Sequence, residues 1–130
     1  MVTEDYVNFD TAELLNEKGF SDVQVYTYYS RYGGSFDMSP RVVTNKVLYT
    51  YGYIAAPTQQ MAMKWLREKY NIYINIQPDF PSEIGYKMCW CWSVSILHKN
   101  CINTKRHQCY IETYEEAVEA ALKHSLEYLI

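Results

Sequence analysis

The sequence predicts an α+β domain in which helices cover one face of a mostly antiparallel sheet of about five strands. Apolar and polar residues alternate with a period of two in several stretches, and apolar residues recur at helical spacing in others. These stretches follow the order α-β-β-α-β-β-β-α, without the regular strand–helix alternation of a doubly wound fold. Because 130 residues is an ordinary length for one domain, we expect a single α+β domain over residues 1–130.

The first expected element is a short helix over residues 11–18. Asp10 and Glu13 have the spacing of a capping box, in which each side chain accepts a hydrogen bond from the other residue's backbone N–H. Gly19 follows, and glycine readily adopts the left-handed conformation that ends helices. Both ends of this helix are therefore marked in the sequence.

Two strands are expected next, over residues 23–29 and 41–54, because β-branched and aromatic residues alternate with other residues in both. Gly33 and Gly34 begin the loop between them, and antiparallel pairing is the simplest arrangement. Tyrosines on these strands would form ladders on the sheet: Tyr26, Tyr28, Tyr49, Tyr51 and Tyr53.

The clearest stretch is residues 55–77, where a helix leads directly into a buried strand. Pro57 and Thr58 suit the first turn and the cap of a helix, and Asn71 can end it in the left-handed conformation. Trp65 lies on the apolar stripe of this helix, so we expect it in the core. The strand then places isoleucines on one face: Ile72, Ile74 and Ile76.

Two more strands and a helix complete the expected fold. The first strand has the longest apolar face in the sequence: Tyr86, Met88, Trp90, Trp92, Val94 and Ile96. The polar stretch 98–106 is expected to be the loop of a hairpin whose second strand covers residues 107–112. Thr113 and Glu116 form a second capping box, which begins the C-terminal helix.

Charge and hydropathy restrict the classes of function. The net charge is −3 and the basic residues are scattered, whereas binding to nucleic acid or to an anionic membrane draws on clustered Lys and Arg. The sequence contains no apolar run long enough to span a membrane and no basic-then-apolar start typical of a signal peptide. We therefore expect no membrane association, disfavour nucleic acid as a partner, and expect a cytoplasmic protein whose four cysteines are thiols.

The aromatic content indicates a binding role. The sequence has 14 tyrosines, and phenolic hydroxyls need hydrogen-bond partners or water, so many rings are expected at half-buried or exposed positions. An exposed aromatic sheet face is typical of a surface that binds a partner or a second copy. We expect a non-catalytic binding or protein-interaction module that forms a homo-oligomer or binds a protein partner. A small-molecule ligand stays an alternative, no cofactor is expected, and cross-strand packing explains the rings without any ligand.

The candidate interaction surface combines the strand tyrosines, two tryptophans and a basic and aromatic group on the last hairpin: Tyr26, Tyr28, Tyr49, Tyr51, Tyr53, Trp90, Trp92, Lys99, Lys105, Arg106 and Tyr110. The hairpin group has the composition of a weak single-strand nucleic-acid binder, which stays an alternative function. Its three charges are few, and a solvated loop explains them better.

Cysteine and histidine residues gather near the same hairpin: Cys89, Cys91, His98, Cys101, His107 and Cys109. Zinc binds four such ligands, but the sequence contains no CxxC pair, so we expect no metal site. Small thiols buried in a hairpin explain the cluster, and no feature marks an activated thiolate, so we expect no catalytic residue. A small nucleotide- or metal-handling enzyme that uses this hairpin stays an alternative.

Three segments together resemble a known family. They are residues 56–68 (APTQQMAMKWLRE), the earlier residues 9–12 (FDTA) and the later residues 114–117 (YEEA). They are similar to an uncharacterised family of small proteins found in phages and mobile elements of gut bacteria, and the resemblance spans most of the chain. It implies an accessory protein in the cytoplasm of the bacterial host cell and supplies no catalytic or cofactor-binding residue.

Overall fold

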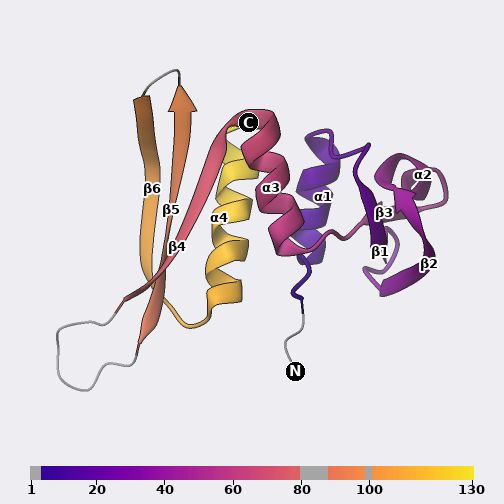
Figure 1. The fold of residues 1–130 in the computed structure, drawn as a ribbon. Coiled ribbons are helices and arrows are strands. Elements are labelled where there is room, and N and C mark those ends of the chain that lie inside the picture. The colour runs from indigo at the N-terminus through magenta and orange to yellow at the C-terminus, as the bar shows by residue number, and fades with distance from the viewer. Residues whose placement is uncertain (1–3, 80–87, 99–100) are drawn as a thin grey trace. The chain divides into compact units, whose positions relative to one another are not determined.

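The computed structural model describes residues 4–79, 88–98 and 101–130, and of residues 98 and 101–107 it describes the backbone alone. The described elements are α1 (Phe9–Glu17), β1 (Gln24–Ser30), β2 (Phe36–Thr44), α2 (Asn45–Thr50), β3 (Tyr53–Ala55), α3 (Gln59–Tyr70), β4 (Ile72–Asp79), β5 (Cys89–His98), β6 (Cys101–Ile111) and α4 (Tyr114–Tyr128) (Figure 1). The predicted α+β class is confirmed. The described strands form two three-stranded antiparallel sheets, however, and not one sheet of about five.

Two compact units make up the chain, Met1–Met61 and Ala62–Ile130. The first contains the sheet β2-β1-β3, and the second contains the sheet β4-β5-β6. α3 begins at the end of the first unit and runs into the second. Among the described residues, no helix combines the length and the hydrophobicity that crossing a membrane requires. The expectation of a single domain stays a prediction.

In the first unit, β1 is the central strand and pairs antiparallel with both neighbours. β2 and β3 therefore run in the same direction, and α2 connects them. Tyr29 pairs with Phe36 on β2 and with Ile54 on β3, so these three side chains share a sheet face. α1 covers part of that face, because the Phe9 ring packs edge-on against Tyr29 with centroids 5.7 Å apart.

The helix α1 begins two residues before the predicted start. Asn8 caps it, since its Oδ1 accepts a hydrogen bond of 2.9 Å from the Thr11 backbone N–H. The predicted capping box at Asp10 is therefore wrong in register. Gly19 has a φ of 92° and ends the helix as expected.

The predicted strand over residues 41–54 is interrupted by α2. The Thr44 hydroxyl caps this short helix by accepting from the backbone N–H three residues later. After the helix, Gly52 turns the chain with a φ of +87°. Tyr49 therefore lies on α2 and Tyr51 at its end, and the predicted tyrosine ladder on one strand is wrong for both.

Asn45, at the start of α2, is the polar centre of the first unit and is only 2% exposed. Its Nδ2 donates to Asn16 Oδ1 at 2.8 Å and to the Phe20 carbonyl at 2.7 Å. Its Oδ1 accepts from the Ala55 backbone N–H at 2.7 Å. The Asn45 side chain thus connects α2 to α1, to the chain after α1 and to β3. Both of its polar atoms have hydrogen-bond partners, as buried polar atoms require.

The helix α3 has both predicted ends. Thr58 Oγ1 accepts from the Met61 backbone N–H at 3.2 Å at its start, and Asn71 has a φ of 56° just after its end. Trp65, expected in the core, is only half-buried, and its ring packs against Tyr70 with centroids 5.3 Å apart. The buried apolar positions of the helix are Ala62, Met63 and Leu66.

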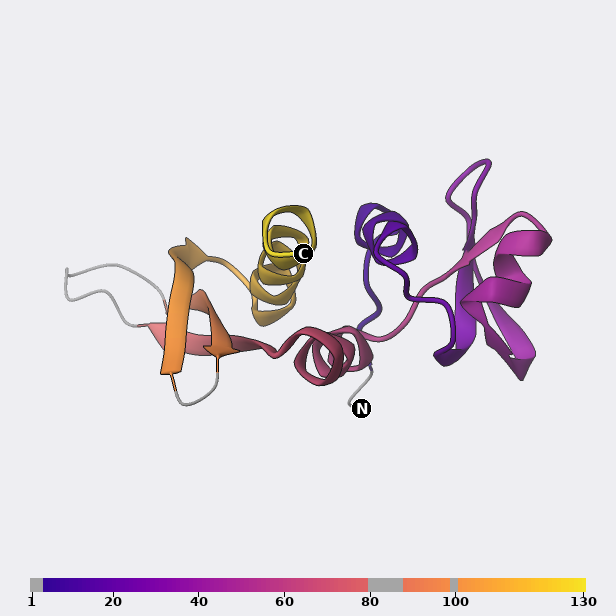
Figure 2. The ribbon, with the colours of Figure 1, turned by 90° about the horizontal axis from the view of Figure 1, so that it is seen from above.

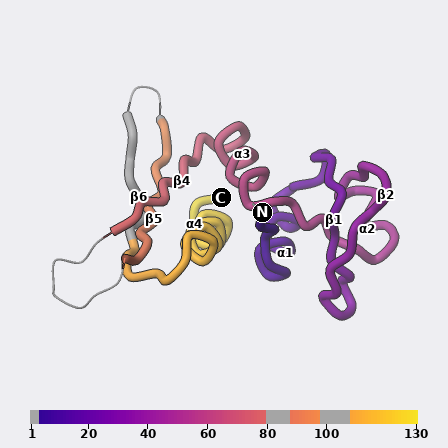
Figure 3. The backbone as a smooth tube through the Cα atoms, turned by 60° about the horizontal axis from the view of Figure 1, so that its bottom comes forward, coloured from indigo at the N-terminus to yellow at the C-terminus, as the bar shows by residue number. Residues whose placement is uncertain are grey.

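In the second unit, α4 lies on one face of the sheet β4-β5-β6 (Figure 2 and Figure 3). The predicted apolar face of β5 points towards this helix, because Trp90 packs against Tyr114 and Trp92 against His124. Val94, on the same face, is fully buried. The cysteines of β5 alternate with these residues and lie on the other face.

The predicted nine-residue loop of the last hairpin is wrong. β5 continues to His98, β6 begins at Cys101, and these two residues are register partners. β-Formers such as Ile102 and Thr104 let the polar stretch continue the ladder. The predicted position of Tyr86 lies outside the described residues.

Candidate functional site

The outer face of β1 brings together three of the predicted tyrosines. Val25 and Thr27 are buried, so the alternating residues Tyr26 and Tyr28 lie on the opposite face of the sheet. Tyr53 of β3 joins them, with its ring centroid 4.7 Å from that of Tyr28. Tyr26 is 55% exposed and Tyr53 is 36% exposed. The tyrosine face, as we call it, consists of these three tyrosines and the neighbouring carboxylate: Tyr26, Tyr28, Tyr53 and Asp37.

Asp37 is the acidic member of the tyrosine face. It pairs with Tyr28 in the register of β1 and β2, and a side-chain hydrogen bond joins the two residues. Desolvation, together with the nearby Asp37 charge and Tyr53, raises the pKa of Tyr28 above its ordinary value. The phenol therefore stays protonated at neutral pH and remains a hydrogen-bond donor on this surface.

Tyr49 belongs to a different surface. The Arg31 guanidinium lies over its ring, 4.1 Å from the centroid, beside a hollow of about 380 Å³. Ile54 also lines this hollow, and Ile54 shares the sheet face of Tyr29, opposite to that of Tyr28. The structure therefore separates Tyr49 from the tyrosine face. Tyr51, at the end of α2, is 75% exposed.

The two tryptophans of the candidate surface lie in the second unit, on the side of the sheet that α4 covers. Trp90 is half-buried against Tyr114, and Trp92 is 2% exposed. The Trp92 indole N–H donates to Gln108 Oε1 at 3.2 Å, so its polar atom is used internally. Trp92 is a core residue, and its inclusion in an interaction surface is corrected.

The basic and aromatic group of the last hairpin is described only in part. Lys99 lies outside the described residues, and the side chains of Lys105 and Arg106 on β6 lie outside them as well. Tyr110 is 73% exposed and has a φ of 66°, next to the register shift between β5 and β6. Binding of single-stranded nucleic acid at this group stays an untested alternative, and nucleic acid stays a disfavoured partner.

Cys91 and Cys109 form a disulfide, so the expectation that all four cysteines are thiols is wrong. The register explains the pairing: Trp92 pairs with Gln108, which places the preceding residue of β5 opposite the following residue of β6. The two Cα atoms are 4.1 Å apart. Neighbouring strands thus bring together two cysteines that are 18 residues apart in the sequence.

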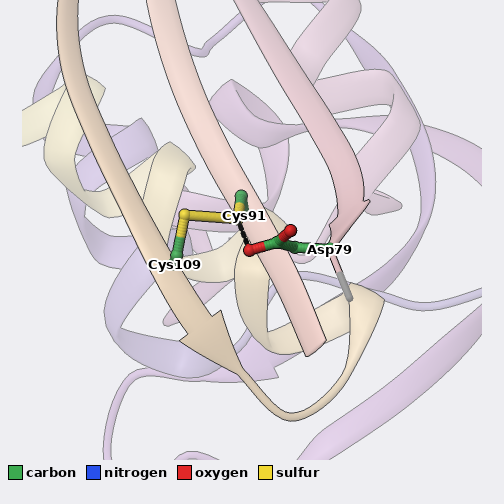
Figure 4. Close-up of side chains that lie close together, drawn as sticks. All are labelled: Asp79, Cys91 and Cys109. Carbon is green, nitrogen blue, oxygen red and sulfur yellow. Dashed lines mark hydrogen bonds between the residues drawn. A yellow bond between two sulfur atoms is a disulfide. The ribbon is translucent and has the colours of Figure 1, made fainter. Parts of the chain in front are cut away.

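Asp79 of β4 completes a cluster of side chains, one from each strand of the sheet (Figure 4). Its Oδ2 lies 3.8 Å from Cys91 Sγ, and the ligand atoms of the three residues all lie within 4.8 Å of one another. Cys89 is a free, buried thiol, and its Sγ lies 3.7 Å from the Asp79 carbonyl oxygen. We call Asp79, Cys91 and Cys109 the thiol–carboxylate cluster.

The sequence prediction omits Asp79 because the expected helix and strand end at residue 77, before Pro78. β4 instead continues through Pro78 to Asp79, since β4 is an edge strand and an edge position tolerates a residue without a backbone N–H. The histidines considered beside the cysteines, His98 and His107, have side chains outside the described part of the chain.

Comparisons with protein-family models, curated proteins and solved structures find no match to this chain.

Proposed function

We propose that this protein is a non-catalytic interaction module that self-associates through the tyrosine face of its first unit. The observation that carries the proposal is the gathering of Tyr26, Tyr28 and Tyr53 on one sheet face, with two of the rings more than a third exposed. Tyrosine is enriched in protein interfaces, because it offers a large rigid ring and a hydroxyl that both donates and accepts.

A second copy of the chain is the occupant that the chemistry of this face favours. Rings pack against rings in offset or edge-on geometry, and tyrosine hydroxyls bond to one another or to a carboxylate. A two-fold interface brings the same patch of both copies together, so a patch must be complementary to itself. The tyrosine face meets this condition, since Asp37 can accept from a tyrosine hydroxyl of the second copy and no cation is needed.

The negative charge of Asp37 and of the whole chain argues against nucleic acid as a partner of the tyrosine face. Asp37 would lie close to any backbone phosphate that accompanied a base stacked on Tyr28 or Tyr53, and the chain carries a net charge of −3. The resemblance to proteins of phages and mobile elements is compatible with this role, and we propose an accessory function in the bacterial host cell.

Sedimentation velocity over the micromolar range tests the proposal. We expect the 15.4 kDa chain to approach twice its mass as concentration rises. Tyr26→Ser removes the most exposed ring of the tyrosine face and should weaken the dimer at least tenfold, or about 1.4 kcal/mol. Circular dichroism should show an unchanged fold, because this side chain is exposed.

Tyr73→Ser is the matched control. Tyr73 is 41% exposed, but it lies on β4 in the second unit. Its loss should leave the sedimentation profile unchanged. A strict monomer at every concentration, or equal weakening by Tyr26→Ser and Tyr73→Ser, would overturn the proposal.

A further inference from the structure

We infer that the reduced thiol–carboxylate cluster of Asp79, Cys91 and Cys109 is a site for a thiophilic divalent cation such as Zn²⁺, and that the Cys91–Cys109 disulfide closes this site. The inference does not depend on self-association, because the cluster belongs to the sheet of the second unit.

Ligand identity is the first support. Zinc in proteins is bound by cysteine sulfur at about 2.3 Å and by carboxylate oxygen at about 2.0–2.2 Å, most often in tetrahedral geometry. Two cysteines and one aspartate provide three such ligands, and each comes from a different strand of one sheet (Figure 4). The backbone ladder holds the three Cα positions before any cation arrives.

Distance is the second support. In a tetrahedral zinc site with these bond lengths, a sulfur and a carboxylate oxygen are separated by about 3.6 Å. The observed distance between Cys91 Sγ and Asp79 Oδ2 is 3.8 Å, and all three ligand atoms lie within 4.8 Å of one another. Once the S–S bond is broken, rotation about the Cα–Cβ bonds is enough to separate the two sulfurs to a zinc-binding distance.

Charge is the third support. A carboxylate beside two thiolates concentrates negative charge at partly buried positions, which is costly without a counter-charge. A divalent cation supplies the charge that this cluster would need in its reduced, ionised form.

The redox step balances with a thiol reductant. A dithiol reduces the Cys91–Cys109 bond by transferring two electrons and two protons to the sulfurs, and is itself oxidised to a disulfide. The contact between Cys91 Sγ and Asp79 Oδ2 then becomes an S–H···O hydrogen bond, because a disulfide sulfur has no proton to donate. Binding of Zn²⁺ displaces both thiol protons to solvent and leaves the fourth coordination position for water.

Cobalt titration of the full chain tests the inference, because Co²⁺ occupies zinc sites and thiolate ligands give it a strong charge-transfer absorption. The chain is reduced with a phosphine, freed of reductant under anaerobic conditions and titrated with Co²⁺. We expect one Co²⁺ per chain with tetrahedral thiolate absorption, displaced by Zn²⁺. The oxidised chain should bind none, and this comparison requires no substitution.

Three variants locate the site. Cys91→Ser should abolish the absorption, whereas Cys89→Ser, a matched loss of the neighbouring thiol outside the cluster, should retain it. Asp79→Asn should keep the thiolate bands but weaken binding at least about tenfold. The inference is overturned if the reduced chain binds no Co²⁺, if the oxidised chain binds equally well, or if Cys89→Ser abolishes binding and Cys91→Ser does not.

Discussion

Replacing Asn45 by alanine should destabilise the first unit more than any loss of a surface side chain. Asn45 makes three hydrogen bonds, to Asn16, to the Phe20 carbonyl and from the Ala55 N–H, and it is 2% exposed. Alanine makes none of them. The backbone groups of Phe20 and Ala55 then lose this partner in a region where water does not replace it easily, since both residues are buried.

The magnitude follows from these contacts. Leaving a buried donor or acceptor unsatisfied costs about 1–3 kcal/mol, and two backbone groups are affected. Allowing for partial relaxation, Asn45→Ala should lower the free energy of unfolding by about 2–4 kcal/mol. Domains have a total stability of about 5–15 kcal/mol, so the loss is large enough to measure without ambiguity.

Urea denaturation followed by far-UV circular dichroism measures this loss. Tryptophan fluorescence is the poorer probe, because Trp65, Trp90 and Trp92 all lie in the second unit. Asn75→Ala is the matched control, since this asparagine is exposed on β4 and its loss should change stability by no more than about 0.5 kcal/mol. Equal midpoints for the two variants would refute the role assigned to Asn45.

Three further variants test the fold and the tyrosine face. Asp37→Asn should lower the raised pKa of Tyr28, and an unchanged value in an NMR titration would contradict the pairing. Because folding raises the pKa of Tyr28, the protonated phenol contributes to the stability of the folded chain. This contribution is fully present below pH 10.0 and is lost as the pH rises through the pKa of Tyr28 in the folded state. Gly52→Ala should lower the free energy of unfolding by about 1–2 kcal/mol, because the φ of +87° at this position strains any residue with a side chain. Leu66→Ala should lower it by about 2–5 kcal/mol, because Leu66 is fully buried. Thermal or chemical unfolding beside the parent chain checks both, and an unchanged midpoint would contradict either.

Local signals in the sequence predicted the ends of α3 and the two faces of β5. Thr58 and Asn71 mark the two ends of α3, because capping depends on nearby residues. The alternation of β5 correctly separated a tryptophan face from a cysteine face, because a strand has only two sides. Such features need no knowledge of distant contacts.

The errors arose where distant contacts decide the structure. The hydrogen bonds of Asn45 to residues 10 or more positions away favour α2 in a stretch whose alternation favours a strand. Pairing of Cys91 with Cys109 depends on the register of β5 and β6, and the position of Asp79 depends on β4 being an edge strand. Trp65 and Leu66 are neighbours on the same helix, and only tertiary packing determines which one is fully buried.

Intermolecular NOE measurement on a mixture of ¹³C-labelled and unlabelled chains tests whether two copies meet at the tyrosine face. Isotope filtering selects contacts between protons of different copies, at a concentration where sedimentation indicates association. We expect cross-peaks from the ring protons of Tyr26 and Tyr53, and their loss in Tyr26→Ser. Association whose intermolecular cross-peaks arise only from residues outside the tyrosine face, such as Tyr73 or Tyr128, would contradict it.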